Sequence, residues 1–82
     1  MNLKELIENK TKVGQEVVDY LRERLPGNEI YLDYIDPQPG YFLKIKINGK
    51  QLAFFTPYSM ASEERGEMVL ERVIWYDRIH MI

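Results

Sequence analysis

The chain has 82 residues, of which 45% are hydrophobic and 29% charged, and its formal net charge is −2. Fewer than roughly 100 residues supply a single hydrophobic core, and this apolar fraction is too high for a disordered chain. The slightly acidic net charge argues against a protein whose surface is covered with basic side chains for binding duplex nucleic acid. The sequence has no cysteine and one histidine, which excludes disulfides and the usual zinc sites.

The N-terminus resembles the start of a folded domain rather than a targeting segment. Its first ten residues, MNLKELIENK, are polar and charged, unlike the apolar region of a signal peptide. Apolar runs such as residues 73–76 are far shorter than the roughly 18 residues of a membrane span. We therefore expect a complete, free-standing cytoplasmic protein with one domain, residues 1–82.

The first part of the chain predicts one long helix over residues 2–25. Its apolar residues recur three and four positions apart and therefore share one helix face. These residues are Leu3, Leu6, Ile7, Val13, Val17, Val18, Leu21 and Leu25. Asn2 and Glu5 fit a capping box at the start, and Pro26 ends the helix. Gly14 interrupts the pattern, and it indicates either a close helix approach or a break in the helix.

Three strands are predicted next, over residues 29–35, 41–47 and 50–56. These segments are rich in β-branched and aromatic residues and are separated by turn-forming residues. The last two strands flank Asn48 and Gly49. This dipeptide is the strongest short-range hairpin signal, because a type I′ turn needs a positive φ at both central positions.

The two-residue loop fixes how the hairpin strands pair, with Phe42 opposite Phe55 at the far end. Since side chains alternate along a strand, the pairing separates an apolar face from a mixed one. The apolar face consists of Leu43, Ile45, Leu52 and Phe54. The mixed face consists of Phe42, Lys44, Lys46, Gln51, Ala53 and Phe55.

The C-terminal part predicts a second helix over residues 59–77. Ser59 or Ser62 can cap it, glutamates fill its first turn, and its apolar residues keep helical spacing. Gly66 and the β-favouring residues 73–76 support an alternative, in which residues 67–82 are partly strand. In a strand, the adjacent residues Glu71 and Arg72 would place one charge on each face of an otherwise apolar segment, so we favour the helix.

The predicted order is α-β-β-β-α, an α+β fold in which two helices pack on one face of a three-stranded antiparallel meander. This order resembles that of the double-stranded-RNA-binding domain. That family carries lysines at the start of its last helix, whereas residues 62–67 here read SEERGE and are acidic. We therefore infer no membership of that family, and the order of elements alone implies no function.

The sequence predicts neither a catalytic site nor a cofactor or metal site, and we expect a protein that is not an enzyme. His80 lies near the C-terminus, where a general base has no reliable pocket or orienting partner. Asp33 and Asp36 precede a strand that carries lysines, as in some metal-dependent nucleases. Such a site needs an acid two residues before the lysine, and Phe42 occupies that position. The glutamates of the second helix are typical of a solvated helix face.

Aromatic residues are the feature that points to a function. There are ten of them, one Trp, six Tyr and three Phe, which is more than a core of this size can bury. Large rigid rings are favoured at protein interfaces. We therefore expect a small interaction module that binds another protein, as an adaptor, inhibitor or regulator, with a second copy of the chain as a further candidate partner. The predicted contact residues are Tyr41, Phe42, Lys44, Lys46, Phe55 and Tyr58.

Two alternatives to protein binding stay open. Lysines beside aromatic rings on a sheet are also the groups that bind single-stranded nucleic acid. The plain alternative is an ordinary solvated sheet face with one cross-strand aromatic pair. The sequence does not predict membrane binding.

Overall fold

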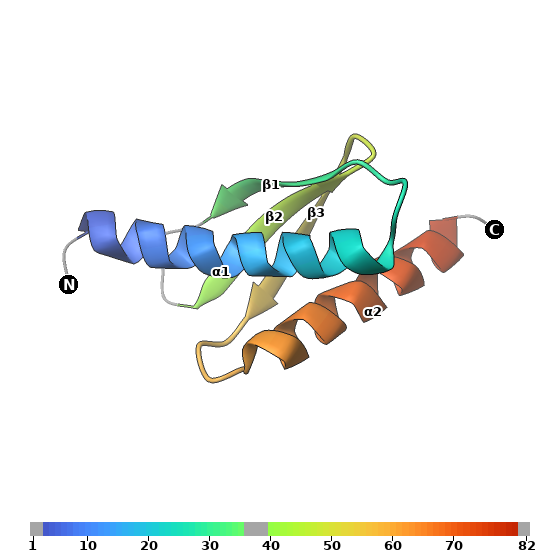
Figure 1. Ribbon diagram of the computed structural model, residues 1–82. Coiled ribbons are helices and arrows are strands. Elements are labelled where there is room, and N and C mark those ends of the chain that lie inside the picture. The colour runs from blue at the N-terminus through green and yellow to red at the C-terminus, as the bar shows by residue number, and fades with distance from the viewer. Residues whose placement is uncertain (1–2, 36–39, 81–82) are drawn as a thin grey trace.

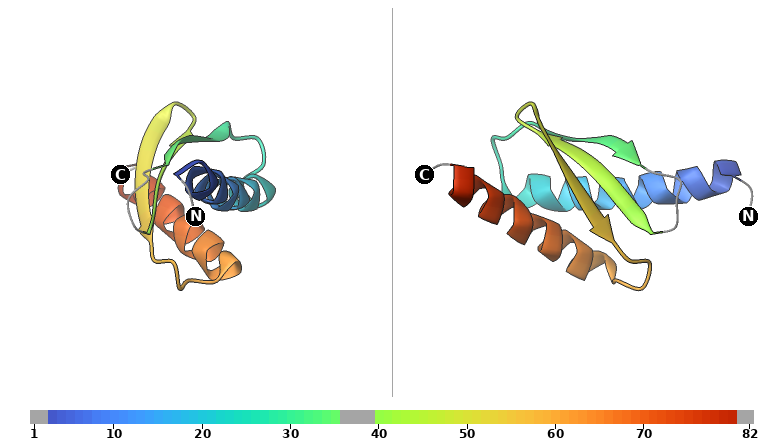
Figure 2. Two further views of the ribbon diagram at one scale, coloured as in Figure 1. Left: turned by 90° about the vertical axis from the view of Figure 1, so that its left-hand side faces the viewer. Right: turned by 180° about the vertical axis from the view of Figure 1, so that it is seen from behind.

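The computed structural model describes residues 3–35 and 40–80. It contains α1 (Leu3–Arg24), β1 (Ile30–Ile35), β2 (Tyr41–Ile47), β3 (Lys50–Thr56) and α2 (Ser62–His80). The strands form one antiparallel sheet in the order β1-β2-β3, and both helices pack on the same side of it (Figure 1 and Figure 2). The predicted α+β fold with the order α-β-β-β-α is confirmed.

Buried apolar side chains from all five elements form the core of the described part of the chain. They are Val17, Val18, Leu21, Ile30, Leu43, Ile45, Phe54, Val69 and Val73. The apolar face predicted for the hairpin therefore lies against the helices, with Leu52 packed at its margin. Ile7 is exposed although the helical periodicity placed it on the apolar stripe, because the first turns of α1 project beyond the strands (Figure 1).

Helix α1 is continuous, so a break at Gly14 is wrong, and Gly14 itself is buried. The C-terminal end of α1 is well defined. The amide of Leu25 still donates to the carbonyl of Leu21 at 2.8 Å, and Gly27 then turns the chain with φ +82°. Glycine adopts such a φ without strain, which is why it commonly ends helices. The predicted capping box involves Asn2, which lies outside the described residues.

The predicted hairpin register is confirmed at every pair of β2 and β3, including Phe42 opposite Phe55. Asn48 and Gly49 both have positive φ, 51° and 87°, as a type I′ turn requires. The mixed face of the hairpin therefore points away from the core.

Strand β1 joins β2 through a β-bulge that the sequence analysis did not include. Leu32 pairs with Ile45 and Tyr34 pairs with Lys44, so Asp33 is an extra residue in β1. A bulge of this kind bends and twists the strand that contains it.

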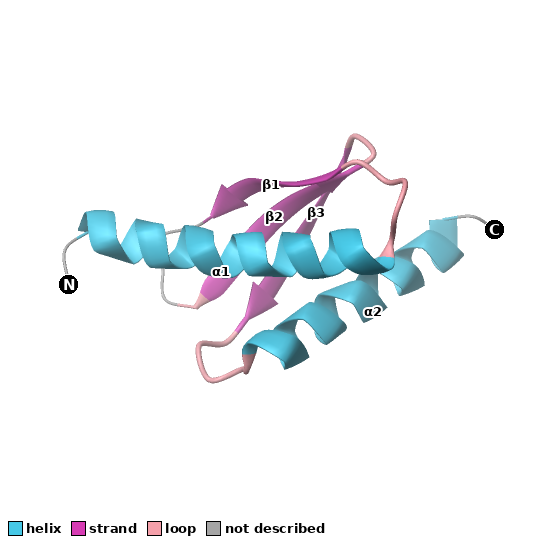
Figure 3. Ribbon diagram, viewed as in Figure 1, coloured by secondary structure: helices cyan, strands magenta, loops and turns pink. Residues whose placement is uncertain are grey.

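Helix α2 begins at residue 62 rather than 59 and continues to residue 80 rather than 77, so the partial-strand alternative is wrong for its described residues. Its first hydrogen bond runs from the amide of Arg65 to the carbonyl of Ala61, at 2.9 Å. A loop separates it from β3 (Figure 3). The hydroxyl of Ser62 donates to a carboxylate oxygen of Glu16 at 2.9 Å, so this serine ties α2 to α1.

The two helices make a close contact at Gly66. A Cβ atom placed on this glycine would lie 2.7 Å from Cγ of Tyr20, so the ring packs directly on the backbone of α2. The guanidinium of Arg24 covers the ring at 3.4 Å from its centroid. Gly66 of α2 thus allows the two helices to approach closely.

Candidate binding face of the sheet

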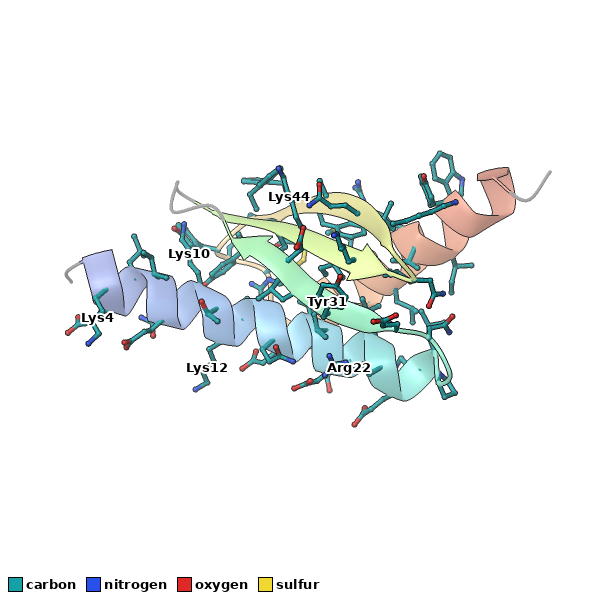
Figure 4. All side chains as sticks on the ribbon, turned by 90° about the horizontal axis from the view of Figure 1, so that it is seen from above. Lys4, Lys10, Lys12, Arg22, Tyr31 and Lys44 are labelled. Atoms are coloured by element: carbon teal, nitrogen blue, oxygen red, sulfur yellow. The ribbon has the colours of Figure 1, made fainter. Side chains whose placement is uncertain are left out.

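The side of the sheet that faces away from the helices carries the mixed hairpin residues. We call it the open face. It consists of Tyr31, Asp33, Phe42, Lys44, Lys46, Gln51, Ala53 and Phe55. Figure 4 shows Lys44 on the opposite side of the sheet from α1. Strand alternation produces this arrangement, because the neighbours of each buried residue in β2 must point outward.

Phe55 is the most exposed aromatic side chain of the open face, at 58%. Its ring packs over the backbone of Gly40, where a Cβ atom would lie 2.6 Å from Cε2 of the ring. Gly40 also has φ +88°, a conformation that glycine adopts readily. The ring is therefore held in place by backbone beneath it, next to half-buried Phe42 on the paired strand.

A polar bridge crosses the middle strand on the same face. The side-chain amide of Gln51 in β3 donates to a carboxylate oxygen of Asp33 in β1. Lys46 of β2 pairs with Gln51 on one side and with Tyr31 on the other. The open face thus combines two lysines, one bridged carboxylate and three aromatic side chains.

Tyr31 and Asp33 are members of this face that the sequence analysis did not predict as site residues. Tyr31 is 38% exposed. The two-residue turn gave the register of β2 with β3, but a longer connection joins β1 to β2 and the bulge shifts their pairing. The period-2 pattern of β1 was therefore not enough to place these side chains beside the lysines.

Tyr41 and Tyr58, which were also predicted as contact residues, do not lie on the open face. Their rings meet edge to face, with centroids 4.9 Å apart and planes at 88°. The Arg65 guanidinium lies 4.7 Å from the centroid of Tyr41. The six predicted residues are thus divided: Phe42, Lys44, Lys46 and Phe55 share the open face, and the two tyrosines form a separate tyrosine cluster.

Two buried cationic side chains adjoin the tyrosine cluster. Arg65 is 4% exposed and donates from Nε to the hydroxyl of Thr56 at 3.0 Å and from Nη2 to the carbonyl of Met60 at 2.6 Å. Lys10 is 1% exposed, and its Nζ lies 5.8 Å from the ring centroid of Tyr58. Figure 4 shows Lys10 directed from α1 toward the sheet, whereas Lys4 and Lys12 point away. These contacts connect α1, the sheet and α2, so the cluster has a packing role.

Neither a metal centre nor a membrane span is found in the described ranges, 3–35 and 40–80. No three histidine, aspartate or glutamate side chains there are close enough to hold a metal ion. No helix there is long and apolar enough to cross a bilayer.

Comparisons with known proteins give no match: no protein family, curated protein or solved structure is significantly similar to this chain. The function is therefore inferred from the residues of the open face.

Proposed function

We propose that this protein binds another protein through the open face of its sheet. The observation that supports the proposal most is the ring of Phe55, which is largely exposed although backbone beneath it holds it in place. An exposed ring of fixed orientation can bury a large area in a complex while losing little conformational entropy.

The charges beside the aromatic side chains indicate the chemistry of the partner. Lys44 and Lys46 lie along the middle strand, and their long side chains suit the polar rim of an interface. A partner surface with an apolar centre and nearby carboxylates would complement them. Because the chain has no cysteine, the reducing cytoplasm suits it, and we expect to find the partner there.

Single-stranded nucleic acid is the alternative ligand for the same face. Aromatic rings would stack on bases and the two lysines would contact phosphates. The carboxylate of Asp33 lies on this face as well, and the chain as a whole has net charge −2. Since phosphate contacts dominate nucleic-acid affinity, these charges favour protein as the ligand.

The first prediction concerns Phe55. Tagged wild-type protein, Phe55→Ala and Tyr58→Ala are each used for affinity capture from nuclease-treated extract, and the retained proteins are quantified by mass spectrometry. We expect Phe55→Ala to lose the specific partner, by about tenfold or more, as loss of a central aromatic contact does. Tyr58→Ala is the matched control, because it removes an aromatic side chain of similar exposure outside the open face. Circular dichroism verifies that both variants fold, since the Tyr58 ring also packs on Tyr41.

A partner that is retained equally by all three proteins would show that the open face is not the binding surface. The nucleic-acid alternative is tested separately with a fluorescent mixed-sequence oligonucleotide at low salt. Binding that weakens steeply with added salt and is lost in a Lys44→Glu, Lys46→Glu variant would favour that alternative over protein.

A further inference from the structure

The outer edge of β3 is open for pairing with another strand. In a hairpin with a two-residue turn, the residues on either side of the turn exchange hydrogen bonds, so alternate residues of β3 direct their backbone groups outward. These residues are Gln51, Ala53 and Phe55, and all three are exposed. Within the described part of the chain, their outward amides and carbonyls have no hydrogen-bond partner.

The opposite edge of the sheet, at β1, is protected. Arg22 of α1 donates from Nε to the outward carbonyl of Ile30 at 2.9 Å. The bulge at Asp33 also interrupts the regular backbone of β1. Side-chain caps and bulges are the usual means by which proteins prevent edge-to-edge association. Strand β3 has neither, and its seven residues pair in regular register with β2.

A groove and an exposed aromatic ring border the open edge. A groove of about 310 Å³ lies between β3 and α2, lined by Ala53 and Phe54 from the strand and by Arg72 and Trp75 from the helix. Trp75 is 65% exposed, more than the other large apolar side chains of the described residues. In a strand paired at this edge, alternate side chains would lie over the open face.

We propose that the strand added at the open edge is β3 of a second copy of this chain. The two β3 strands pair in antiparallel orientation about a twofold axis at Ala53. A symmetric interface must be complementary to itself. In this pairing Ala53 lies opposite the partner subunit's Ala53, and Gln51 lies opposite the partner subunit's Phe55. Neutral side chains thus meet along the outward positions, and no like charges oppose each other.

The α2 side of the interface carries charges of both signs. A second groove, of about 290 Å³, is lined by Met68, Glu71, Arg72 and Trp75. Glutamate and arginine are adjacent there, so a twofold axis can bring each charge toward its opposite on the other subunit. The two chains would form one six-stranded sheet with a continuous open face. This pairing uses the backbone of β3 and does not depend on the proposed partner binding.

The second prediction tests this dimer by sedimentation equilibrium of the full chain from micromolar to millimolar concentration. We expect the wild type to approach twice the 9.8 kDa of one chain. Ala53→Pro removes an outward amide that β2 does not use, so the fold should survive while the dimer dissociation constant rises about tenfold or more. Ala53→Thr keeps the amide and is the matched control, with circular dichroism to verify folding.

Charge variants at the same position give an independent test if the proline variant does not fold. Ala53→Glu alone and Ala53→Lys alone should each be monomeric, because like charges would meet at the twofold axis. An equimolar mixture should form heterodimers. The proposal is overturned by a monomeric wild type at every concentration, by a dimer that persists in Ala53→Pro, or by a mixture that fails to associate. A monomeric wild type that captures its partner through Phe55 would leave the proposed function intact.

Discussion

Thr56 is a fully buried threonine whose hydroxyl accepts a hydrogen bond from the buried guanidinium of Arg65. This single contact joins the end of β3 to the first turn of α2. The guanidinium has no carboxylate within ion-pair distance among the described residues, so neutral acceptors and the ring of Tyr41 surround it. Each acceptor is therefore important, because a buried charged donor without a partner is strongly destabilising.

The third prediction, at the scale of a residue, is that Thr56→Val lowers the free energy of unfolding by about 1–3 kcal/mol. Valine has nearly the same shape, but it leaves Nε of Arg65 without its acceptor. Thr56→Ser keeps the hydroxyl and removes only a methyl group, and it should cost about 1 kcal/mol. Urea unfolding followed by circular dichroism measures both. Equal losses would show that the hydrogen bond contributes nothing beyond packing.

At the scale of elements, Asn48 links the β2–β3 turn to the loop between α1 and β1. Its side chain accepts from the amide of Glu29 and donates to the side-chain oxygen of Asn28, both at 2.9 Å. Its own amide donates to the carbonyl of Glu29 at 2.8 Å. The residue also has φ 51°, which asparagine tolerates better than most residues. One side chain thus serves both the turn conformation and the attachment of β1.

The fourth prediction separates these two roles of Asn48. Asn48→Ala removes the side-chain hydrogen bonds and adds backbone strain, for a combined loss of about 2–3 kcal/mol in unfolding free energy. Asn48→Gly removes the same bonds but accommodates the positive φ. Its loss of unfolding free energy should therefore be about 1 kcal/mol smaller than that of Asn48→Ala. Chemical denaturation compares the variants. If the alanine and glycine variants are equally stable, the turn conformation is not a source of strain.

At the scale of the whole molecule, the sheet has two chemically different sides. Adjacent residues of β2 illustrate the difference: Ile45 is fully buried against the helices, whereas Lys46 is on the open face. The charge is uneven as well, since the net charge of −2 arises entirely from residues 58–82. Helix α2 therefore supplies the acidic side of the molecule, and the middle strand supplies a lysine-bearing side.

The fifth prediction tests this two-sidedness. Ile45→Ala should cost about 2–5 kcal/mol, because it removes buried methyl groups and leaves a cavity. Small domains are stable by only about 5–15 kcal/mol, so this variant should unfold at much lower urea concentration. Lys46→Ala, one position along, should change the free energy of unfolding by about 0.5 kcal/mol or less. A comparable loss at Lys46 would mean that the open face contributes to the fold itself.

The sequence by itself determined the elements and the hairpin of this protein. Their signals act between residues close in the chain: helical spacing of apolar residues, a proline after the first helix, and Asn48 with Gly49 at the turn. The turn also fixed which of Phe42, Lys44, Lys46 and Phe55 share a face, because a two-residue loop allows one register. Element ends were less exact, since the hydroxyl of Ser62 bonds to Glu16 of the other helix.

Only the tertiary structure decided how distant segments meet. The bulge at Asp33 depends on how β1 fits both the core and β2, which no local pattern specifies. Strand alternation from Leu43 already puts Tyr41 on the core side of β2, but only the folded chain brings Tyr58 and Arg65 to its ring. The protected β1 edge and the open β3 edge also differ through a tertiary contact, from Arg22 of α1. Packing between segments far apart in the chain is the physical reason for all three.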